Sequence, residues 1–249
     1  MSWGGDKCQA VTDDGAYDFR SAKEFLKLMN RLYRAYDPYI RWLATMPLTP
    51  LSRRFGQGRG TPIDRWYIDA VLDAHRDVIH GDVYEVAEST YTHRYATGAY
   101  VPHAIHVGGI RGMEKVDLAT GEGVREAMAD CFICTQTLQF IYDVQSAAKN
   151  IYKMLKSGGT VILSANGINP LSLSDYHAWG EYWNFTAQSL RRLLQDAGFA
   201  ADQIEIRSHG NIKIAVCYLY GLCQEDLQES DFLYEDEQFP MLLTAVCKK

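Results

Sequence analysis

Hydrophobic and polar positions in the middle of the chain change from a strand pattern to a helix pattern and back. Residues 131–134 are a short apolar run that predicts a buried strand. Apolar residues then recur at helical spacing over residues 147–155, and the glycines at 158–159 are predicted to stop the helix. The apolar and β-branched residues 160–163 predict a second strand, which completes one βαβ unit.

This βαβ unit also predicts where a ligand binds. A helix that crosses between two adjacent strands requires a parallel sheet with helices on its faces. Ligands of such sheets bind at the carboxyl ends of the strands. The chemistry is therefore expected just after Cys134 and just after Ser164.

The same patterns in the rest of the chain predict an α/β protein. Helices are expected over residues 17–45, from a start at Thr61 and Pro62, and over residues 186–197 and 212–223. Further strands are predicted at residues 83–87, 104–107, 115–118, 204–207 and 241–247. We expect a helical extension and lid loop over residues 1–60. An α/β domain over residues 61–249 should follow, with a central, mostly parallel seven-stranded sheet and helices on both faces.

Composition indicates a globular protein and excludes some classes of partner. Of the 249 residues, 47% are hydrophobic, so the chain can bury a sizeable core. A net charge of -6 argues against nucleic-acid binding, because phosphate backbones require a basic face. No apolar run is long enough to span a membrane, and the first residues lack the pattern of a signal peptide. A cytoplasmic location is therefore expected.

Cys131 and Cys134 have the C-x-x-C spacing of many metal and redox motifs. Residues three apart on a strand point to opposite faces, so the two thiols cannot converge on one ion. No second cysteine pair is present to complete a zinc site. We therefore expect both cysteines to pack in the core, and no bound metal.

A loop rich in proline, arginine and glycine is predicted over residues 48–60. Its composition favours a solvated connector. The alternative is a mobile lid, because arginine loops beside a cleft often clamp anionic substrates.

The order of elements from about residue 62 onward resembles the class I S-adenosylmethionine-dependent methyltransferases. The segment LKSGG at residues 155–159 is similar to the family's leucine–lysine–proline–glycine–glycine turn, and residues 130–138 are similar to its fourth-strand segment. Residues 64–72 and 179–199 resemble a bacterial branch associated with sugar and secondary-metabolite methylation. The resemblance implies a Rossmann-like fold and S-adenosylmethionine as the cofactor.

The resemblance also implies a cofactor-binding role for residues that close the first strand. Glu85 fits the acidic residue that helps hold the ammonium group of the cofactor. The family then has a glycine-rich turn, so that the backbone can approach the methionine moiety. Here Ala87, Ser89 and Tyr91 occupy the glycine positions, and alanine or serine fits if its φ is negative. The absence of G-x-G-x-x-G argues against a dinucleotide.

Further cofactor contacts are implied at the ends of the next strands. His106 stands where the family usually has a carboxylate that accepts both ribose hydroxyls, and a neutral imidazole has one acceptor nitrogen. Asp117 is placed to accept the adenine amino group while Leu118 packs on the purine. Thr135 and Gln136, after the fourth strand, are candidates to line the cofactor. The alternatives are a buried structural histidine at 106 and helix caps at 117 and 135.

Aromatic residues crowd the connection after the strand at 160–165, which covers the acceptor pocket in this family. Flat rings with a few polar groups suit a ring-shaped acceptor, whether a sugar or an aromatic compound. The other interpretation is that the rings pack this connection onto the sheet. The candidate acceptor-binding residues are Tyr176, Trp179, Tyr182 and Trp183.

Methyl transfer requires a base only where the nucleophile must lose a proton. His177 is the first candidate, because it lies in this connection and an imidazole titrates near neutral pH. Asp175 and His209 are further candidates, and some enzymes of this kind need no base.

Three functions are compatible with these features. The first is methylation of a small hydroxylated or aromatic acceptor, a sugar or a secondary metabolite, by in-line transfer from S-adenosylmethionine. The second is another reaction on the same fold, such as cyclisation or isomerisation, and the third is a catalytically silent binding subunit. The altered glycine-rich turn and His106 keep the last two open. The sequence does not define the acceptor, the methylated atom or whether the protein forms a homo-oligomer.

Overall fold

The computed structural model describes residues 19–249, and its contacts divide the chain into two units between Thr49 and Pro50. The first two residues of the predicted N-terminal helix, 17 and 18, lie outside the described residues. The division falls earlier in the chain than the boundary predicted at residue 60, because residues 50–60 pack with the second unit.

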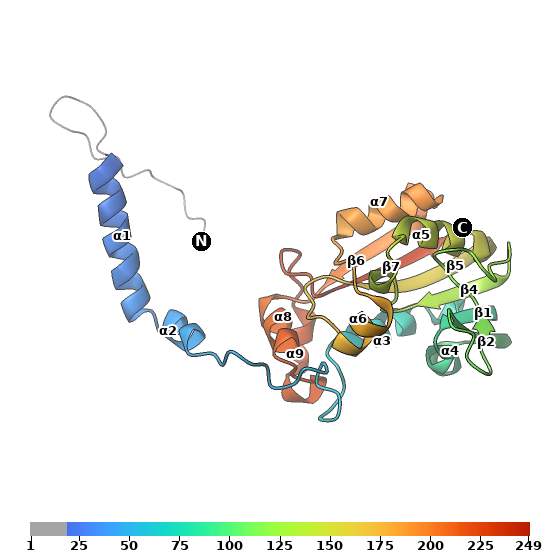
Figure 1. Ribbon diagram of the computed structural model, residues 1–249, viewed down its shortest axis with the longest axis horizontal. Coiled ribbons are helices and arrows are strands. Elements are labelled where there is room, and N and C mark those ends of the chain that lie inside the picture. The colour runs from blue at the N-terminus through green and yellow to red at the C-terminus, as the bar shows by residue number, and fades with distance from the viewer. Residues whose placement is uncertain (1–18) are drawn as a thin grey trace. The chain divides into compact units, whose positions relative to one another are not determined.

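The first unit consists of helix α1 (Phe19–Tyr36) and helix α2 (Pro38–Ala44), as Figure 1 shows. The single helix predicted over this region is broken at Asp37. The Asp37 carboxylate accepts a hydrogen bond from the Ile40 amide at 3.2 Å and so caps α2, which begins with a proline. The apolar stripe of α1 is exposed and includes Phe25, Leu28, Met29 and Leu32.

The second unit is built on one seven-stranded sheet with the order β3-β2-β1-β4-β5-β7-β6 (Figure 1). The pairs formed among β1 to β5 are parallel, and β7 runs antiparallel to both β5 and β6. The prediction of a seven-stranded, mostly parallel sheet is confirmed. The strands are β1 (Gly81–Val86), β2 (Tyr100–His106), β3 (Glu114–Lys115), β4 (Ala129–Cys134), β5 (Leu155–Asn166), β6 (Ile204–His209) and β7 (Leu242–Lys248).

Two layers of helices cover the two faces of this sheet (Figure 1). On one face α5 and α7 pack against Phe132 and Leu163, and on the other α3, α4, α8 and α9 surround Val83 and Ile133. The helices are α3 (Asp64–Ala74), α4 (Thr90–Tyr95), α5 (Val144–Met154), α6 (Leu173–Trp179), α7 (Ala187–Ala197), α8 (Ile212–Leu219) and α9 (Glu229–Leu233). Short 3-10 turns occur at η1 (Arg76–Val78), η2 (Leu138–Phe140), η3 (Ala201–Gln203) and η4 (Gln224–Asp226).

The two cysteines of the C-x-x-C spacing lie in different layers of the core. Cys131 packs with α3 and α8, whereas Cys134 packs with α5 and α7. Both side chains are buried, and burial raises the pKa of each thiol to about 12. The prediction that these cysteines are core residues on opposite faces is confirmed.

The predicted βαβ unit is present as β4, α5 and β5, but its second turn differs from the prediction. Helix α5 already ends at Met154, so Gly158 and Gly159 do not stop it and lie within β5. The strand register shifts here, because Ala129 pairs with Leu155 and Cys131 pairs with Thr160. Lys156 stabilises the extended segment by binding the carboxylates of Asp82 at 2.8 Å and Asp130 at 2.7 Å.

The start of α3 was also predicted wrongly. Thr61 is not the helix cap, because its amide and hydroxyl both donate to the Glu225 carboxylate. Pro62 pairs with Cys223 in an isolated antiparallel bridge, and the helix begins only at Asp64. The sequence pattern of a capped helix is overridden by contacts with a segment more than 160 residues away.

Candidate active site

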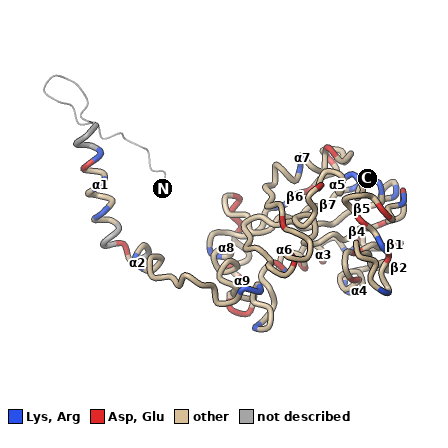
Figure 2. Tube along the Cα trace, in the orientation of Figure 1, with Lys and Arg blue, Asp and Glu red and all other residues tan. Residues whose placement is uncertain are grey.

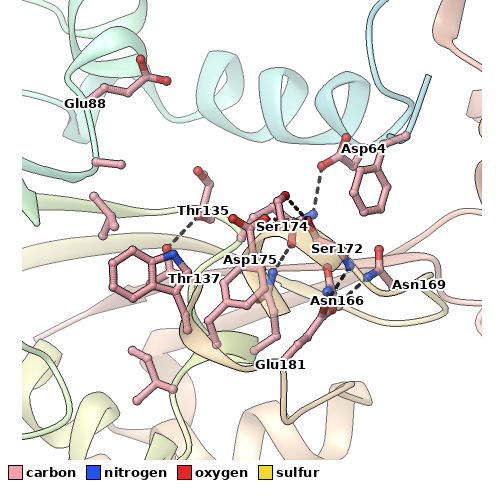
Figure 3. A pocket seen from close by; sticks show the side chains of 18 of the residues that line it. Asp64, Glu88, Thr135, Thr137, Asn166, Asn169, Ser172, Ser174, Asp175 and Glu181 are labelled. Carbon is pink, nitrogen blue, oxygen red and sulfur yellow. Dashed lines mark hydrogen bonds between the residues drawn. The ribbon is translucent and has the colours of Figure 1, made fainter. Parts of the chain in front are cut away.

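A cavity of about 1220 Å³ lies at the carboxyl ends of β1, β2, β4 and β5. Figure 3 shows the polar side chains that line part of it. Ala87, Val107 and Thr135, the residues that directly follow β1, β2 and β4, all contribute to its wall. This is the edge of the sheet that the βαβ unit predicted as the place of chemistry.

Glu85 closes β1 and orders the turn that follows it. It is only 2% exposed, and its carboxylate accepts hydrogen bonds from the Tyr91 amide, the Thr92 amide and the Thr92 hydroxyl. Burial raises the pKa of Glu85, and the hydrogen bonds from Thr92 oppose that rise. Three of about four acceptor positions on the carboxylate are therefore used to hold the start of α4.

Ala87 takes the backbone conformation that a glycine would take. Its φ is +71°, in the left-handed region, and its amide donates to the Ile105 carbonyl at 2.8 Å. The condition of a negative φ, under which alanine or serine fits this turn, is met by Ser89, whose φ is −118°, and not by Ala87. The turn thus keeps the shape expected of its first glycine position and adds a Cβ atom to the cavity wall.

His106 ends β2 and lines the cavity, with its ring edge-to-face against Trp179 at a centroid distance of 5.6 Å. The Gly108 amide donates to its Nδ1 at 2.9 Å. That bond uses the acceptor nitrogen, so in the neutral ring the proton lies on Nε2. His106 therefore offers the cavity a donor, whereas the carboxylate usual at this position would offer acceptors.

Asp117 lies after the short strand β3 and is half-buried in the cavity wall, next to the buried Leu118. Its Oδ1 accepts hydrogen bonds from the amides of Ala119 at 2.8 Å and Thr120 at 3.3 Å. These bonds form a local turn and not the helix cap considered as the alternative for this residue, because residues 118–120 form a turn and no helix lies between β3 and β4. Within the described residues Oδ2 has no donor, so Asp117 can cap the turn and bind a ligand at once.

Three side chains form a polar chain between β4 and the start of α3. Gln136, with φ +49°, donates from its side-chain amide to Asp64 Oδ2 at 3.0 Å and accepts from the Gln139 amide at 3.0 Å. Because an ionised carboxylate only accepts, this orientation of both amides is fixed by Asp64. Two buried oxygens, Asp64 Oδ1 and Gln139 Oε1, have no hydrogen-bond partner among the described residues.

The connection after β5 is held by Glu181. Its carboxylate accepts hydrogen bonds from the side chains of Asn166 and Asn169 and from the Ser172 amide (Figure 3). Asp175 lies beside them and accepts from the Ser172 hydroxyl at 2.6 Å. This cluster folds the connection back over the cavity, and Asn166, Asn169, Asp175 and Glu181 all line it.

The structure brings only some of the predicted acceptor-side residues to the cavity. Trp179 and Tyr182 line it, whereas Tyr176 and Trp183 are not part of its wall. Trp183 instead donates from its indole to the Ile141 carbonyl at 2.9 Å and stacks near Tyr142, as the packing interpretation proposed.

The three candidate bases lie in different places. Asp175 lines the cavity, and His177 is exposed on α6 outside the wall. His209 is 7% exposed, also outside the wall, with its ring nitrogens against Glu235 at 2.6 Å and Thr244 at 2.8 Å. Burial lowers the pKa of His209 despite the neighbouring carboxylate.

Sequence reasoning missed Asp64, Gln139 and Tyr218, all of which are buried and line the cavity. Asp64 was taken as part of an ordinary helix start, where an acidic residue suits the helix dipole. Its burial was the missing information, and only the packing of α3 against the sheet supplies it. Tyr218 lies in an apolar helix pattern, and burial raises its pKa well above the usual range.

The described part of the chain contains neither a metal-binding cluster nor a helix that could span a membrane. Residues 19–249 hold no group of three or more His, Cys, Asp or Glu side chains that could bind a metal ion. In the same residues, every helix is too short or too polar to cross a membrane.

Comparisons with known proteins agree with this architecture. Residues 81–163 match the family profile of the methyltransferase domain. A S-adenosylmethionine-dependent methyltransferase from Mesorhizobium loti is similar in structure, with a TM-score of 0.50, 14% sequence identity and coverage of 75% of this chain and 100% of that chain. The chain thus has the class I S-adenosylmethionine-dependent methyltransferase fold, and the predicted resemblance to that superfamily is confirmed.

Two further structures are similar to this chain at a lower TM-score. A S-adenosylmethionine-dependent methyltransferase from Archaeoglobus fulgidus has a TM-score of 0.47 and 12% identity, covering 74% of this chain and 94% of its own. The [4+2]-cyclase SpnF has a TM-score of 0.47 and 14% identity, covering 88% of this chain and 94% of its own. None of the curated proteins matches the chain in sequence.

Proposed function

We propose that this protein is a S-adenosylmethionine-dependent methyltransferase that acts on a small hydroxylated or aromatic acceptor. The observation that carries the proposal is the division of one cavity into two chemically different halves. The ends of β1, β2 and β3 supply one half, with Ala87, His106 and Asp117. The other half contains the polar chain of Asp64, Gln136 and Gln139.

The first half, which we call the cofactor half, fits an adenosyl group in two respects. Asp117 Oδ2 is available to accept the adenine amino group while Oδ1 holds the local turn. The Nε2–H of His106 can donate to a ribose hydroxyl, although it cannot replace the two acceptors of a carboxylate. The left-handed turn at Ala87 retains the expected path of the backbone, and its Cβ is the one added obstacle.

The second half, which we call the acceptor half, contains two buried oxygen atoms that receive no hydrogen bond from the residues that the structure describes. Asp64 Oδ1 and Gln139 Oε1 are buried and unpartnered among the described residues, and burying such atoms costs about 1–3 kcal/mol each. A hydroxyl group that reaches this chain supplies the missing donor. The aromatic side chains of Trp179 and Tyr182 flank the cavity and suit the face of a ring.

When bound, S-adenosylmethionine supplies a methyl group that its sulfonium already activates towards in-line displacement. The protein has to position the acceptor oxygen, exclude water and receive the proton that the hydroxyl loses. Asp64 and Asp175 are the carboxylates of the acceptor half that can accept this hydrogen bond. Of the three bases proposed from the sequence, Asp175 is the one that lines the cavity, whereas His177 and His209 do not.

Isothermal titration with S-adenosylhomocysteine tests the proposal directly. We expect micromolar binding to the wild-type chain and a loss of about tenfold in Asp117→Asn, because one charge-assisted hydrogen bond contributes about 1.5 kcal/mol or more. Asparagine keeps an oxygen for the turn and replaces the ligand-facing oxygen with a donor. S-inosylhomocysteine, which has a carbonyl in place of the adenine amino group, should bind poorly to wild type and gain relative affinity in Asp117→Asn.

The absence of binding at millimolar cofactor in a folded wild-type chain would refute the proposal. Binding of the cofactor without methylation of any hydroxylated acceptor would favour another reaction on the same fold. The Cβ of Ala87 and the donor at His106 are the features that support this second candidate. The assignment to a bacterial sugar and secondary-metabolite branch stays a prediction, and mass spectrometry of methylated products would test it.

A further inference from the structure

The loop formed by residues 50–60 is fixed at several points to the segment that follows α8. The Leu51 amide donates to the Tyr220 carbonyl at 2.8 Å. At the other end, the guanidinium of Arg59 donates to both oxygens of Asp226 at 3.0 and 3.1 Å. These contacts span more than 160 residues of sequence, so the loop is a packed part of the α/β unit.

Contacts with α8 and the residues that follow it hold the shape of the loop. The Phe55 ring packs on Tyr218 with ring centroids 5.5 Å apart. Gly56 is buried with φ +81°, and a Cβ there would lie 2.9 Å from the Leu222 carbonyl oxygen. Only glycine satisfies both conditions. The loop is therefore a wall of the cavity with a defined backbone, which differs from both the connector and the mobile lid considered from the sequence.

This wall presents two arginines that differ in charge pairing from Arg59 on the same loop and from the other arginines that line the cavity. Arg59 pairs with Asp226, Arg65 lies 3.8 Å from Asp64, and Arg94 lies 3.2 Å from Asp69. Arg53 and Arg54 line the cavity and are exposed, and neither forms an ion pair with any residue in the described part of the chain. Two adjacent guanidinium groups are thus left without a counter-charge at the rim.

The loop that carries these arginines lies beside the acceptor half. Phe55, the residue after Arg54, packs on Tyr218 of α8, and burial together with the nearby Asp64 carboxylate raises the pKa of Tyr218. Phe55, Tyr218 and Asp64 all line the cavity. His106 ends β2 and Asp117 follows β3, the two strands at one edge of the sheet.

We propose that Arg53 and Arg54 bind an anionic group, a carboxylate or a phosphate, on the methyl acceptor. The proposal rests on the proposed function and narrows its acceptor to small acidic molecules. Guanidinium groups match the planar geometry of such anions and bind them through paired, charge-assisted hydrogen bonds. The carboxylate of the cofactor's methionine moiety is a second source of the same chemistry, and the experiment has to separate the two.

The test uses the full chain saturated with S-adenosylhomocysteine and three probes: phenyl phosphate, benzoate and benzyl alcohol. We expect the two anions to bind at least about tenfold more tightly than the neutral alcohol. In the double variant Arg53→Gln/Arg54→Gln this preference should disappear. The affinity for S-adenosylhomocysteine should stay within about twofold of wild type, and the melting temperature should confirm that the variant folds.

The matched control is Arg192→Gln/Arg207→Gln, which removes the same charge from exposed positions outside the cavity. We expect this control to keep the wild-type preference for the anions. If both double variants lose it equally, net charge explains the effect and the proposal is overturned. Equal binding of the anions and the alcohol to wild type would overturn it as well.

A comparison of S-adenosylhomocysteine with 5′-methylthioadenosine, which lacks the amino-acid portion, identifies the source of the anion. If Arg53→Gln/Arg54→Gln weakens only S-adenosylhomocysteine, the arginines hold the carboxylate of the cofactor and the acceptor proposal is wrong. If the wild-type chain binds neither nucleoside, the proposed function fails. The anion titrations, repeated without nucleoside, still show in that case whether the two arginines bind anions.

Discussion

The cofactor half and the acceptor half of the cavity are built in different ways. In the cofactor half, Ala87, His106 and Asp117 stand at the ends of successive strands within one continuous part of the chain. In the acceptor half, residues 53–55, Asp64, Gln139 and Tyr218 come from distant parts of the sequence and meet only through tertiary contacts. The topology of a parallel sheet determines the first half, whereas side-chain packing determines the second.

The two halves also differ in how their carboxylates are satisfied. Glu85 and Asp117 accept hydrogen bonds from backbone amides that are close in sequence. Asp64 binds only side chains, and one of its oxygens has no donor in the described residues. A local backbone partner stabilises the fold without a ligand, whereas an unsatisfied buried oxygen needs a donor from a ligand or from water.

The largest effect is expected from restoring a carboxylate to the cofactor half. His106→Asp should tighten binding of S-adenosylhomocysteine about tenfold, because a carboxylate can accept from both ribose hydroxyls and a charge-assisted hydrogen bond contributes about 1.5–3 kcal/mol. Calorimetry measures the change. His106→Asn is the matched control, because it has one acceptor oxygen and should gain less. Equal affinities of the two variants would show that the ribose does not bind at the end of β2.

A second effect is expected at the left-handed turn. Ala87→Gly should raise the free energy of unfolding by roughly 0.5–1 kcal/mol, since left-handed backbone costs about 1–2 kcal/mol for a residue with a Cβ and glycine costs part of that in entropy. It should also tighten S-adenosylhomocysteine binding by removing the Cβ from the wall. Ala127→Gly, at φ +53° and outside the cavity, should stabilise the fold without changing that affinity. Identical binding changes in the two variants would contradict this assignment.

In the acceptor half, Asp64→Asn should lower stability by about 1 kcal/mol, because it removes the charge that lies 3.8 Å from Arg65 and puts an amide group without an acceptor among the described residues in place of Oδ1, while an oxygen remains for Gln136. Denaturant unfolding measures the loss. Binding of S-adenosylhomocysteine should stay unchanged and methylation should fall. A marked loss of cofactor affinity would move Asp64 into the cofactor half and break the distinction between the halves.

The smallest effect is expected at the amino ends of the strands, away from the cavity. Hydrogen bonds from Lys156 and His103 lower the pKa of Asp82. Burial acts to raise the pKa of Asp130, but the hydrogen bonds from Lys156 and the Asp82 amide, together with the charge of Lys156, outweigh it, and the pKa is lowered. Hydrogen bonds from Asp130 and Asp82 raise the pKa of Lys156.

The sign of the pH dependence follows from these shifts. Carboxyl groups with lowered pKa values stabilise the fold above their unfolded pKa of about 3.9, and this contribution is lost as the pH falls through their folded values. Lys156 has a raised pKa in the folded protein, so it stabilises the fold at pH values below its unfolded pKa. This contribution is lost as the pH rises through its folded pKa. Lys156→Met should therefore cost about 0.5 kcal/mol at neutral pH, because the three side chains are partly exposed, and almost nothing near pH 2. Thermal unfolding against pH checks this, and an equal cost at both pH values would contradict it.

Sequence reasoning located the cofactor half better than the acceptor half. It placed Ala87, His106 and Asp117 at strand ends, and all three line the cavity. It did not anticipate that Ala87 would adopt a positive φ or that Gly108 would use the acceptor nitrogen of His106. Among the bases it proposed, His177 and His209 lie outside the cavity wall, because spacing along a connection does not define which side faces inward.

The sequence by itself determined the order of strands and helices, the parallel sheet and the edge at which the cavity lies, because these follow from local periodicity and from the handed connection between adjacent strands. Only the tertiary structure decided that residues 50–60 form a wall on α8 and that α3 brings Asp64 to Gln136. Such contacts join residues more than 70 positions apart, and no local pattern encodes which of them meet.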